Sequence, residues 1–128
     1  MLVRTHHDLT YAGARAALDA ALARTAEIGG AFALSGGIAQ DKAWTVAGFN
    51  GIPADEFYEA ISNEDAVREG IAQRGRVAAF GGGVPVLVDG ALVGAVGASG
   101  GSAVQDKQVA TAGADAVAAA LTHGEDTP

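Results

Sequence analysis

The pentapeptide Gly97-Ala98-Ser99-Gly100-Gly101 comes close to a catalytic motif. It matches Gly-x-Ser-x-Gly, which presents a nucleophilic serine on a sharp turn between a strand and a helix, and Asp115 and His123 follow in the chain order of α/β-hydrolases. Such a turn needs a strand of a large, mostly parallel sheet, whereas Ser99 follows a predicted hairpin strand in a chain of only 128 residues. We therefore interpret Ser99 as a polar wall residue or a helix-entry group rather than a nucleophile.

Two charged dipeptides, Asp41-Lys42 and Asp106-Lys107, each lie early in a predicted helix of small apolar residues. The ordinary interpretation of such charges is a solvated surface pair of little energetic value. Because Lys42 is followed by Ala43, Trp44 and Val46, we expect it to be partly buried. A buried ammonium could hold an acidic ligand or take part in acid–base chemistry.

Glycines mark two corners of the C-terminal half. Gly81, Gly82 and Gly83 precede Val84-Pro85, and Pro85 predicts a sheet edge or a bulge because it has no N–H to donate. This corner is a candidate pocket lip. The second corner, residues 97–101, leads into a helix whose first N–H groups favour an anion, a carboxylate rather than a nucleotide because no phosphate-loop pattern is present. The alternative is that these glycines only permit tight packing.

The chain has three histidines and no cysteine. Adjacent His6 and His7 rarely reach one metal together, so a structural or exposed role is expected, and no metal site is predicted. His7 is the candidate axial ligand if a haem docks near the first helix. Without cysteine, disulfides, thiolate catalysis and Cys-ligated metals are excluded, which is compatible with a reducing cytoplasm.

Composition predicts one globular domain over residues 1–128, with 49% hydrophobic, 18% charged and 5% aromatic residues. Such low charge density leaves apolar surface, for which homo-oligomerisation is the usual remedy. A net charge of −7 argues against nucleic acid as a partner. No apolar run is long enough for a membrane span, so we expect a cytoplasmic protein without membrane contact.

The apolar pattern predicts an α+β fold, an antiparallel β-sheet built as a hairpin meander and flanked by helices. The firmest element is the hairpin of residues 84–88 and 91–98 around Asp89-Gly90, a dipeptide suited to positive φ. Residues 77–80 are expected to add an extended segment. Helices are predicted over about 8–28, 38–49, from Pro53, over 64–72 with Val67 and Ile71 facing inward, and from Ser102 onward.

Three ordered motifs resemble the GlcG/HbpS family, which includes the C-terminal domain of PduO-type proteins. They are residues 38–43 (Ile-Ala-Gln-Asp-Lys-Ala), residues 81–86 (Gly-Gly-Gly-Val-Pro-Val) and residues 94–100 (Gly-Ala-Val-Gly-Ala-Ser-Gly), the last followed by Gln105-Asp106-Lys107. The resemblance implies an antiparallel sheet flanked by helices and homo-oligomeric assembly. For some members it also implies haem binding, haem degradation or corrinoid binding.

One departure from that family is large. Between the first helix and Ile38, relatives carry a strand, a turn, a second strand and an Arg-Met-Asp-Gly-like segment, whereas this chain has only residues 29–37. Either a partner subunit completes the sheet, or a segment of the natural protein is missing from this sequence. Since we suspect that the Arg-Met-Asp-Gly segment lines the family's pocket, the departure bears on ligand binding.

Three functions remain open. The first is a small oligomeric protein that binds haem or another acidic planar molecule, in a pocket formed by Lys42, Phe49, Gly81, Gly82, Gly83, Pro85, Ser99 and Asp106. The second is an enzyme for a small carboxylic acid, in which Lys42 and Asp106 must lie within hydrogen-bond reach across one cleft. The third is an assembly module without a ligand, with its glycine corners buried at subunit contacts.

Overall fold

The structure is a computed structural model, and it describes residues 35–122. The elements in chain order are α2 (Ser35–Gly48), α3 (Ala54–Ile61), α4 (Asp65–Ile71), β1 (Gly83–Val88), β2 (Ala91–Gly97) and α5 (Ala103–Thr122). This arrangement confirms the predicted α+β class. The helix predicted over 8–28 and all three histidines lie outside the described residues.

The hairpin is the element that local sequence specifies most directly. Strands β1 and β2 are antiparallel, and the turn residues Asp89 and Gly90 have φ angles of 51° and 79°. Positive φ at both central positions is the tight-turn geometry that matches strand twist. The register shifts between Val86 and Leu87, one residue past Pro85. The extra residue of this irregularity is Val93 of β2, which has no partner in β1, so a bulge lies near the proline but on the opposite strand.

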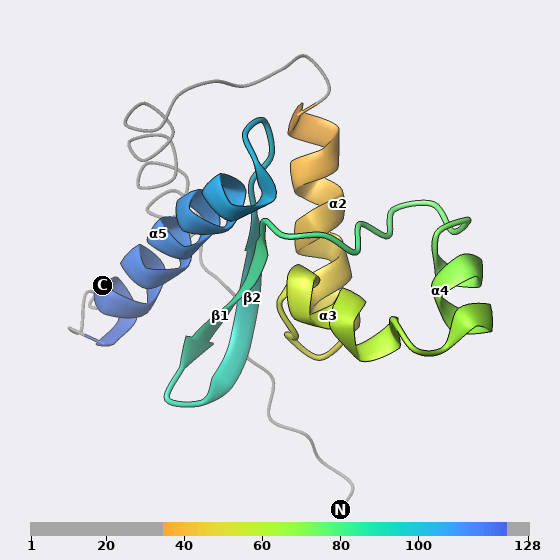
Figure 1. Cartoon of the computed structure of the whole chain (residues 1–128). Coiled ribbons are helices and arrows are strands. Elements are labelled where there is room, and N and C mark those ends of the chain that lie inside the picture. Colours follow the sequence, from red (N-terminus) through yellow and green to blue (C-terminus); the bar gives the residue numbers. More distant parts are fainter. Residues whose placement is uncertain (1–34, 123–128) are drawn as a thin grey trace, which may run out of the picture.

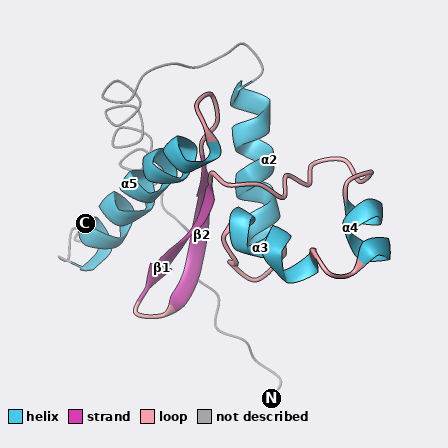
Figure 2. Cartoon of the chain, viewed as in Figure 1, coloured by secondary structure: helices cyan, strands magenta, loops and turns pink. Residues whose placement is uncertain are grey.

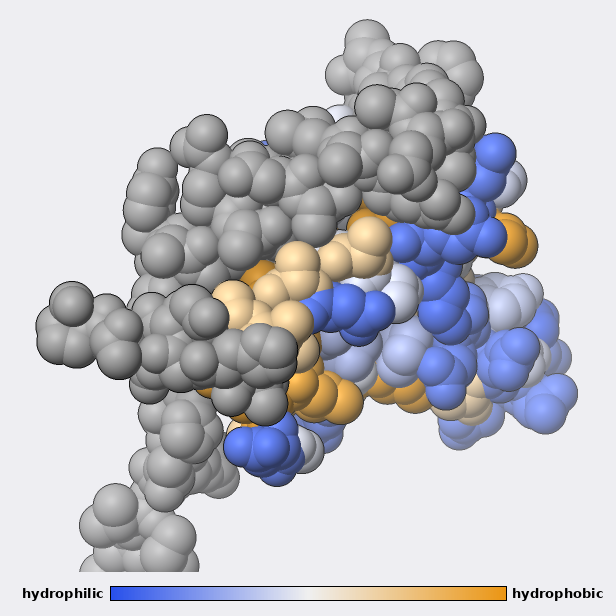
Figure 3. All heavy atoms as spheres, turned by 90° about the vertical axis from the view of Figure 1, so that its left-hand side faces the viewer, coloured by the Kyte–Doolittle hydropathy of each residue, from blue (hydrophilic) through white to orange (hydrophobic). Residues whose placement is uncertain are grey.

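Helices α2 and α5 lie on opposite faces of the hairpin (Figure 1). The α5 face carries the main apolar cluster, in which Val84 and Val86 of β1 pack against Ala110, Ala114 and Val117 of α5. These α5 positions recur at spacings of four and three, so a single helix face reaches the hairpin. On the part of the α5 side that Figure 3 leaves coloured, apolar residues gather in a band with hydrophilic ones beside it.

Two glycines let α2 lie backbone against backbone on the other face. A Cβ on Gly97 would collide with the carbonyl oxygen of Ala39, and one on Gly83 would lie 2.7 Å from the carbonyl oxygen of Lys42. Either contact is too close for a real side chain. Tight packing is therefore the role that these two glycines play within the described residues.

The extended segment predicted over 77–80 is not a strand. The backbone N–H of Ala78 donates to the Thr45 Oγ1 atom (2.9 Å) instead of to a strand ladder, and Thr45 Oγ1 itself donates to the Asp41 carbonyl (2.7 Å). The segment is thus anchored to α2 as a loop, and Figure 2 shows that loop returning from α4 to β1. It carries Phe80 and Gly81, which shape the surface described below.

Helices α3 and α4 begin slightly later than expected. Pro53 lies one residue before α3, and Glu64, rather than Asn63, is the residue before α4. The inward orientation predicted for Val67 is wrong, since this side chain is 39% exposed and α4 buries none of its residues. Across residues 35–122, no helix combines the length and the hydrophobicity needed to cross a bilayer.

Candidate functional site

The ammonium group of Lys42 is completely buried and fully used by the protein. Its Nζ atom lies 3.0 Å from Asp106 Oδ2 and 2.9 Å from the Ala98 carbonyl oxygen, with the Phe80 ring centroid at 4.8 Å. Two oxygens and one ring face account for the three N–H donors of an ammonium. Lys42 therefore ties α2 to the exit of β2 and to the first turn of α5.

Asp106 occupies the glycine corner that the sequence suggested for a carboxylate. Its Oδ1 atom accepts a hydrogen bond from the backbone N–H of Gly101 (2.9 Å). Beside it, Ser102 Oγ accepts from the Gln105 N–H (3.2 Å) and Gln105 Oε1 accepts from the Ser102 N–H (2.9 Å), a reciprocal helix cap. The helix-entry N–H groups thus hold carboxylate and amide oxygens of the protein itself, which an external anion would have to displace.

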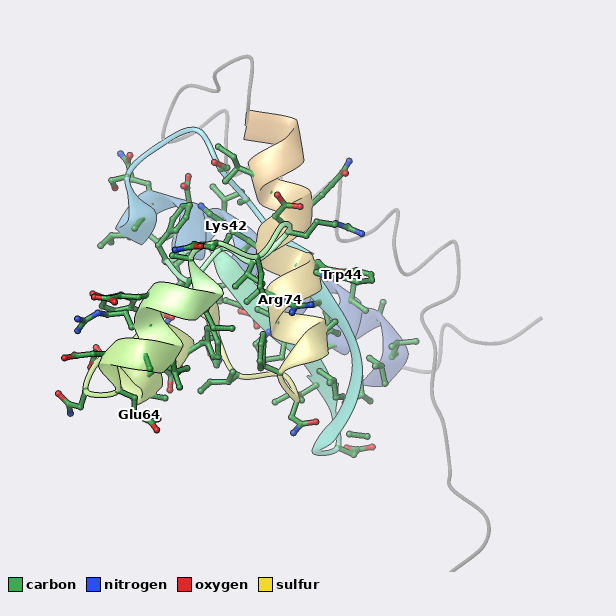
Figure 4. The ribbon with its side chains drawn as sticks, turned by 90° about the vertical axis from the view of Figure 1, so that its right-hand side faces the viewer. Lys42, Trp44, Glu64 and Arg74 are labelled. Carbon is green, nitrogen blue, oxygen red and sulfur yellow. The ribbon has the colours of Figure 1, made fainter. Side chains whose placement is uncertain are left out.

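Gly82 makes this sealed arrangement possible. Its φ is +128°, and a Cβ there would lie 2.6 Å from both Lys42 Nζ and the Ala98 carbonyl oxygen and 2.9 Å from the Asp106 Cβ. Any side chain would therefore push into the ion pair. Figure 4 shows Lys42 and Trp44 extending from opposite sides of α2, so Lys42 faces the interior while Trp44 faces outward.

The predicted pocket residues divide into groups. Lys42, Asp106 and the glycine corner of residues 81–83 meet, and the two charged groups satisfy the hydrogen-bond reach that an acid–base pair needs. Phe49 lies past the C-terminal end of α2, where its ring stacks on Phe57 with centroids 4.3 Å apart. Ser99 is partly buried in the loop after β2, and Pro85 pairs with Ala95 within the hairpin.

An open groove is lined by residues of α3, α4, the 77–81 loop and α5. It consists of three adjoining hollows of about 450, 330 and 320 Å³. Asp55 and Gly81 line both the first and the second hollow, and Tyr58 and Phe80 line both the second and the third. We call these three hollows together the α3–α5 groove. Phe80 separates Lys42 from it, because its ring covers the ammonium on one side and lines the groove on the other.

The groove has apolar walls with charged groups toward its two ends. In the first hollow, Lys107 Nζ lies 2.8 Å from Asp55 Oδ2, an ion pair between α5 and α3. In the third hollow lies Arg68, whose guanidinium donates to the Ser62 carbonyl (2.7 Å) and to Asp65 (3.1 Å). Tyr58 and Phe80 are 46% and 50% exposed, so two aromatic faces border the groove between these cations.

Asp55 carries an unusual feature. Burial raises the pKa of its carboxyl group, but the hydrogen bond and charge of Lys107 and the nearby backbone N–H groups of Asp55 and Glu56 outweigh burial and leave the pKa lowered. Its Oδ1 atom is buried and accepts no hydrogen bond of standard geometry from the described residues. The backbone N–H groups of Asp55 and Glu56 nevertheless stabilise the charged form of this carboxyl group, whose side chain is 41% exposed.

Sequence reasoning missed the groove because its residues come from distant parts of the chain. Asp55 and Lys107 are 52 positions apart. Asp55 is an acidic residue in the first turn of α3, which is an ordinary place for a carboxylate, and nothing in the sequence singles out Tyr58 or Phe80. Between residues 35 and 122, no group of three or more His, Cys, Asp or Glu residues could hold a metal ion.

A family model and several solved structures all relate this chain to HbpS-like proteins. The family model "Haem degrading protein HbpS-like" matches residues 16–115. The crystal structure of Klebsiella pneumoniae protein ORFY superposes with a TM-score of 0.82 at 24% identity, covering 93% of this chain and 97% of that one. A PduOC:haem complex has a TM-score of 0.74 at 25% identity, covering 85% and 94%. HbpS itself has a TM-score of 0.75 at 23% identity, covering 89% and 93%.

One curated relative matches this chain over only part of its length. The uncharacterized 15.0 kDa protein of the dhaT-dhaS intergenic region of Citrobacter freundii is 41% identical over 58 residues, which are 40% of this chain and 41% of that protein. The matched segment thus spans about two fifths of the relative's length.

Proposed function

This chain belongs to the family of haem-degrading HbpS-like proteins, and we propose that it binds haem or a closely related planar, acidic tetrapyrrole in the α3–α5 groove. The observation that carries the proposal is the groove itself, with apolar walls, two exposed aromatic rings and a cation toward each end. Apolar and aromatic surface suits the face of a macrocycle, and Lys107 and Arg68 suit its carboxylates.

The residues predicted from the sequence take supporting positions in this proposal. Gly81 lines the groove, while Lys42 and Asp106 lie beneath Phe80 and hold α2 and α5 in place. Direct contact between a ligand and Lys42 requires the Phe80 ring to move. We also propose that the protein is a homo-oligomer, since Trp44, Leu87 and Val104 expose 55%, 49% and 70% of their surface.

Haem titration of the full chain tests the proposal. We expect a saturable change in the Soret band, weakened about tenfold in Tyr58→Ala through loss of an aromatic face and about fivefold in Lys107→Met through loss of one half-exposed cation. The matched control is Arg74→Gln, which removes a cation from an exposed position that does not line the groove. If micromolar haem changes no spectrum, or if Tyr58→Ala and Lys107→Met both bind haem as the wild type does, the groove is not a haem site.

A second candidate has one observation in its favour. Lys42 and Asp106 form the hydrogen-bonded pair that an enzyme acting on a small carboxylic acid would need. The pair is sealed from solvent, with side-chain exposures of 1% and 9%, so substrate entry requires opening of the Phe80 side. Deuterium exchange into the C–H groups of pyruvate in D₂O would reveal proton transfer. If the wild-type protein produces none, this test gives that candidate no support.

An assembly module without a ligand predicts glycine corners buried at contacts between subunits. Gly83 and Gly97 instead serve a contact within the chain, between α2 and the hairpin, so their close packing does not favour this candidate. The haem titration separates this candidate from the first, because a module of this kind predicts no spectral change at any concentration.

A further inference from the structure

We infer that the outer edge of β2 is the contact between two copies of this chain, which join their hairpins into one continuous antiparallel sheet. The inference rests on the proposed homo-oligomer and names its surface, and it does not depend on haem binding. Within the described residues β2 has a single strand neighbour, β1, so its other edge carries backbone groups without a strand partner.

The register of the hairpin shows which backbone groups these are. The Ala98 N–H donates to the Gly82 carbonyl (2.8 Å), so these two residues form a hydrogen-bonded pair. Opposed residues of an antiparallel ladder alternate between hydrogen-bonded and non-bonded pairs. Gly97 and Ala95 lie one and three positions further along β2, so both belong to non-bonded pairs. Their N–H and C=O groups therefore point away from β1, toward the outer edge of β2.

The two edges of the hairpin differ in how they are protected. Exposed sheet edges usually carry a proline or a charged side chain, which prevents pairing with another strand. On β1, Pro85 is the partner of Ala95 in a non-bonded pair, so the outward position of its backbone has no N–H to offer. The residues of β2, Ala91–Gly97, include neither a proline nor a charged side chain. The β2 edge is therefore the one that is open to a further strand.

The surface beside this edge is hollowed and apolar. A hollow of about 420 Å³ is lined by Ala95 of β2 and, among others, by Ala43, Trp44 and Ala47 of α2. Trp44 leaves 55% of its surface exposed, and Figure 4 shows it extending from the side of α2 opposite to Lys42. An exposed tryptophan next to small apolar residues is typical of a contact between proteins, because the ring buries a large area there.

A two-fold axis at Val96 would pair the two edges completely. Ala95 of one copy then lies opposite the partner's Gly97, and the same pair recurs on the other side of the axis. Each of these pairs exchanges two hydrogen bonds, so every outward N–H and C=O of Ala95 and Gly97 finds a partner. The β2 edge is thus self-complementary, as a two-fold contact between identical chains requires.

The position of α2 agrees with the same axis. Gly83 of β1 and Gly97 of β2 both lie against the backbone of α2, so this helix runs over the middle of the hairpin. An axis perpendicular to the sheet keeps both copies of α2 on one face, separated by two strand spacings, or about 9–10 Å. Packed helices lie at this distance from one another. The exposed side of Trp44 is then covered by the partner's α2.

Disulfide trapping in the full chain tests this contact, because the sequence contains no cysteine. Val96 would face the partner's Val96 in a non-bonded pair with Cα atoms about 4.5 Å apart, a distance that a disulfide can span. We expect Val96→Cys to form a disulfide-linked dimer at least about tenfold faster than Val67→Cys at the same micromolar protein concentration. Val67 is the matched control, a valine of α4 that is 39% exposed. Random collisions favour the control, since Val96 is partly buried and packs against the apolar cluster of α5.

Amide hydrogen exchange of the wild type provides a second measurement that needs no variant. The Val96 N–H is bonded within the hairpin and should be protected at every protein concentration. The N–H groups of Ala95 and Gly97 should exchange at least about tenfold more slowly in the dimer than after dilution to the monomer. Trp44→Glu places a charge in the contact between the two copies of α2 and should abolish this difference.

The inference is overturned if Val96→Cys cross-links no faster than Val67→Cys, or if the Ala95 and Gly97 amides exchange equally at all protein concentrations. Protection that does not depend on concentration would mean that another part of the same chain covers the edge. Sedimentation velocity separates this inference from the proposed homo-oligomer. A monomer at all concentrations removes both, whereas an oligomer without the Val96→Cys cross-link removes the β2 contact alone.

Discussion

Replacement of Lys42 by methionine should destabilise the fold more than removal of any charge outside the Lys42–Asp106 pair within residues 35–122. Methionine keeps the length of the side chain and removes the ammonium. Asp106 Oδ2 and the Ala98 carbonyl then lose the donor that lies 3.0 and 2.9 Å away, in an environment where the Asp106 side chain is only 9% exposed. An unpaired charge at such a site costs about 3–5 kcal/mol.

Urea unfolding followed by circular dichroism measures this cost. Against a total stability of about 5–15 kcal/mol, the loss should move the urea midpoint by about 2–4 M at an m-value of about 1.3 kcal/mol per molar. The double variant Lys42→Met/Asp106→Leu removes both charges and should recover to within about 2 kcal/mol of the wild type. Lys107→Met is the matched control, because its half-exposed ion pair contributes no more than about 1 kcal/mol.

A loss of stability in Lys42→Met no larger than that in Lys107→Met would be the contrary result. That result would mean that the Lys42 ammonium reaches water in solution and that Asp106 is solvated without it. A double variant less stable than the single one would also contradict the argument, since the unpaired carboxylate would then not be the source of the loss.

Two further substitutions give contrasting outcomes. Gly97→Ala should cost several kcal/mol in urea unfolding, because its Cβ collides with the backbone of α2, whereas Gly48→Ala, with no atom within 4 Å of the added Cβ, should leave stability unchanged or slightly raised; equal effects would refute the close contact. The fold lowers the pKa of the Asp55 carboxyl group, so its carboxylate form stabilises the folded state. This contribution to folding stability is complete above the pKa of about 4 that Asp55 has in the unfolded chain, and it is lost as the pH falls through the folded pKa. The stability difference between wild type and Asp55→Asn should therefore be below about 1 kcal/mol at pH 7 and shrink toward pH 3, and a difference that grows on acidification would show the opposite sign.

Local features of the fold could be predicted from the sequence because they depend on neighbouring residues. Asp89-Gly90 determines its turn through the φ angles of two positions, and Ala110, Ala114 and Val117 show their buried face by spacing alone. The burial expected for Lys42 followed in the same way from its apolar neighbours in α2.

Features that join distant segments could be predicted only in part. Asp106, 64 positions from Lys42, is a candidate partner for it in the sequence, but only the fold shows that this pair is closed by Phe80 and is not open to a cleft. The segment at 77–80 has an extended pattern, but Ala78 finds its hydrogen-bond partner in the Thr45 side chain, which no pattern of apolar residues reveals. The groove containing Asp55 and Lys107 arises in the same way, from the approach of α3 to α5.

Amide chemical shifts of the ¹⁵N-labelled full chain, recorded with gallium protoporphyrin as a diamagnetic analogue of haem, test most directly whether the α3–α5 groove binds a tetrapyrrole. We predict the largest shift changes at Tyr58, Phe80, Gly81 and Val104, which line the groove, and none at the hairpin tip around Gly90. The absence of shift changes, or changes concentrated around Trp44 on the outer side of α2, would contradict the proposed site.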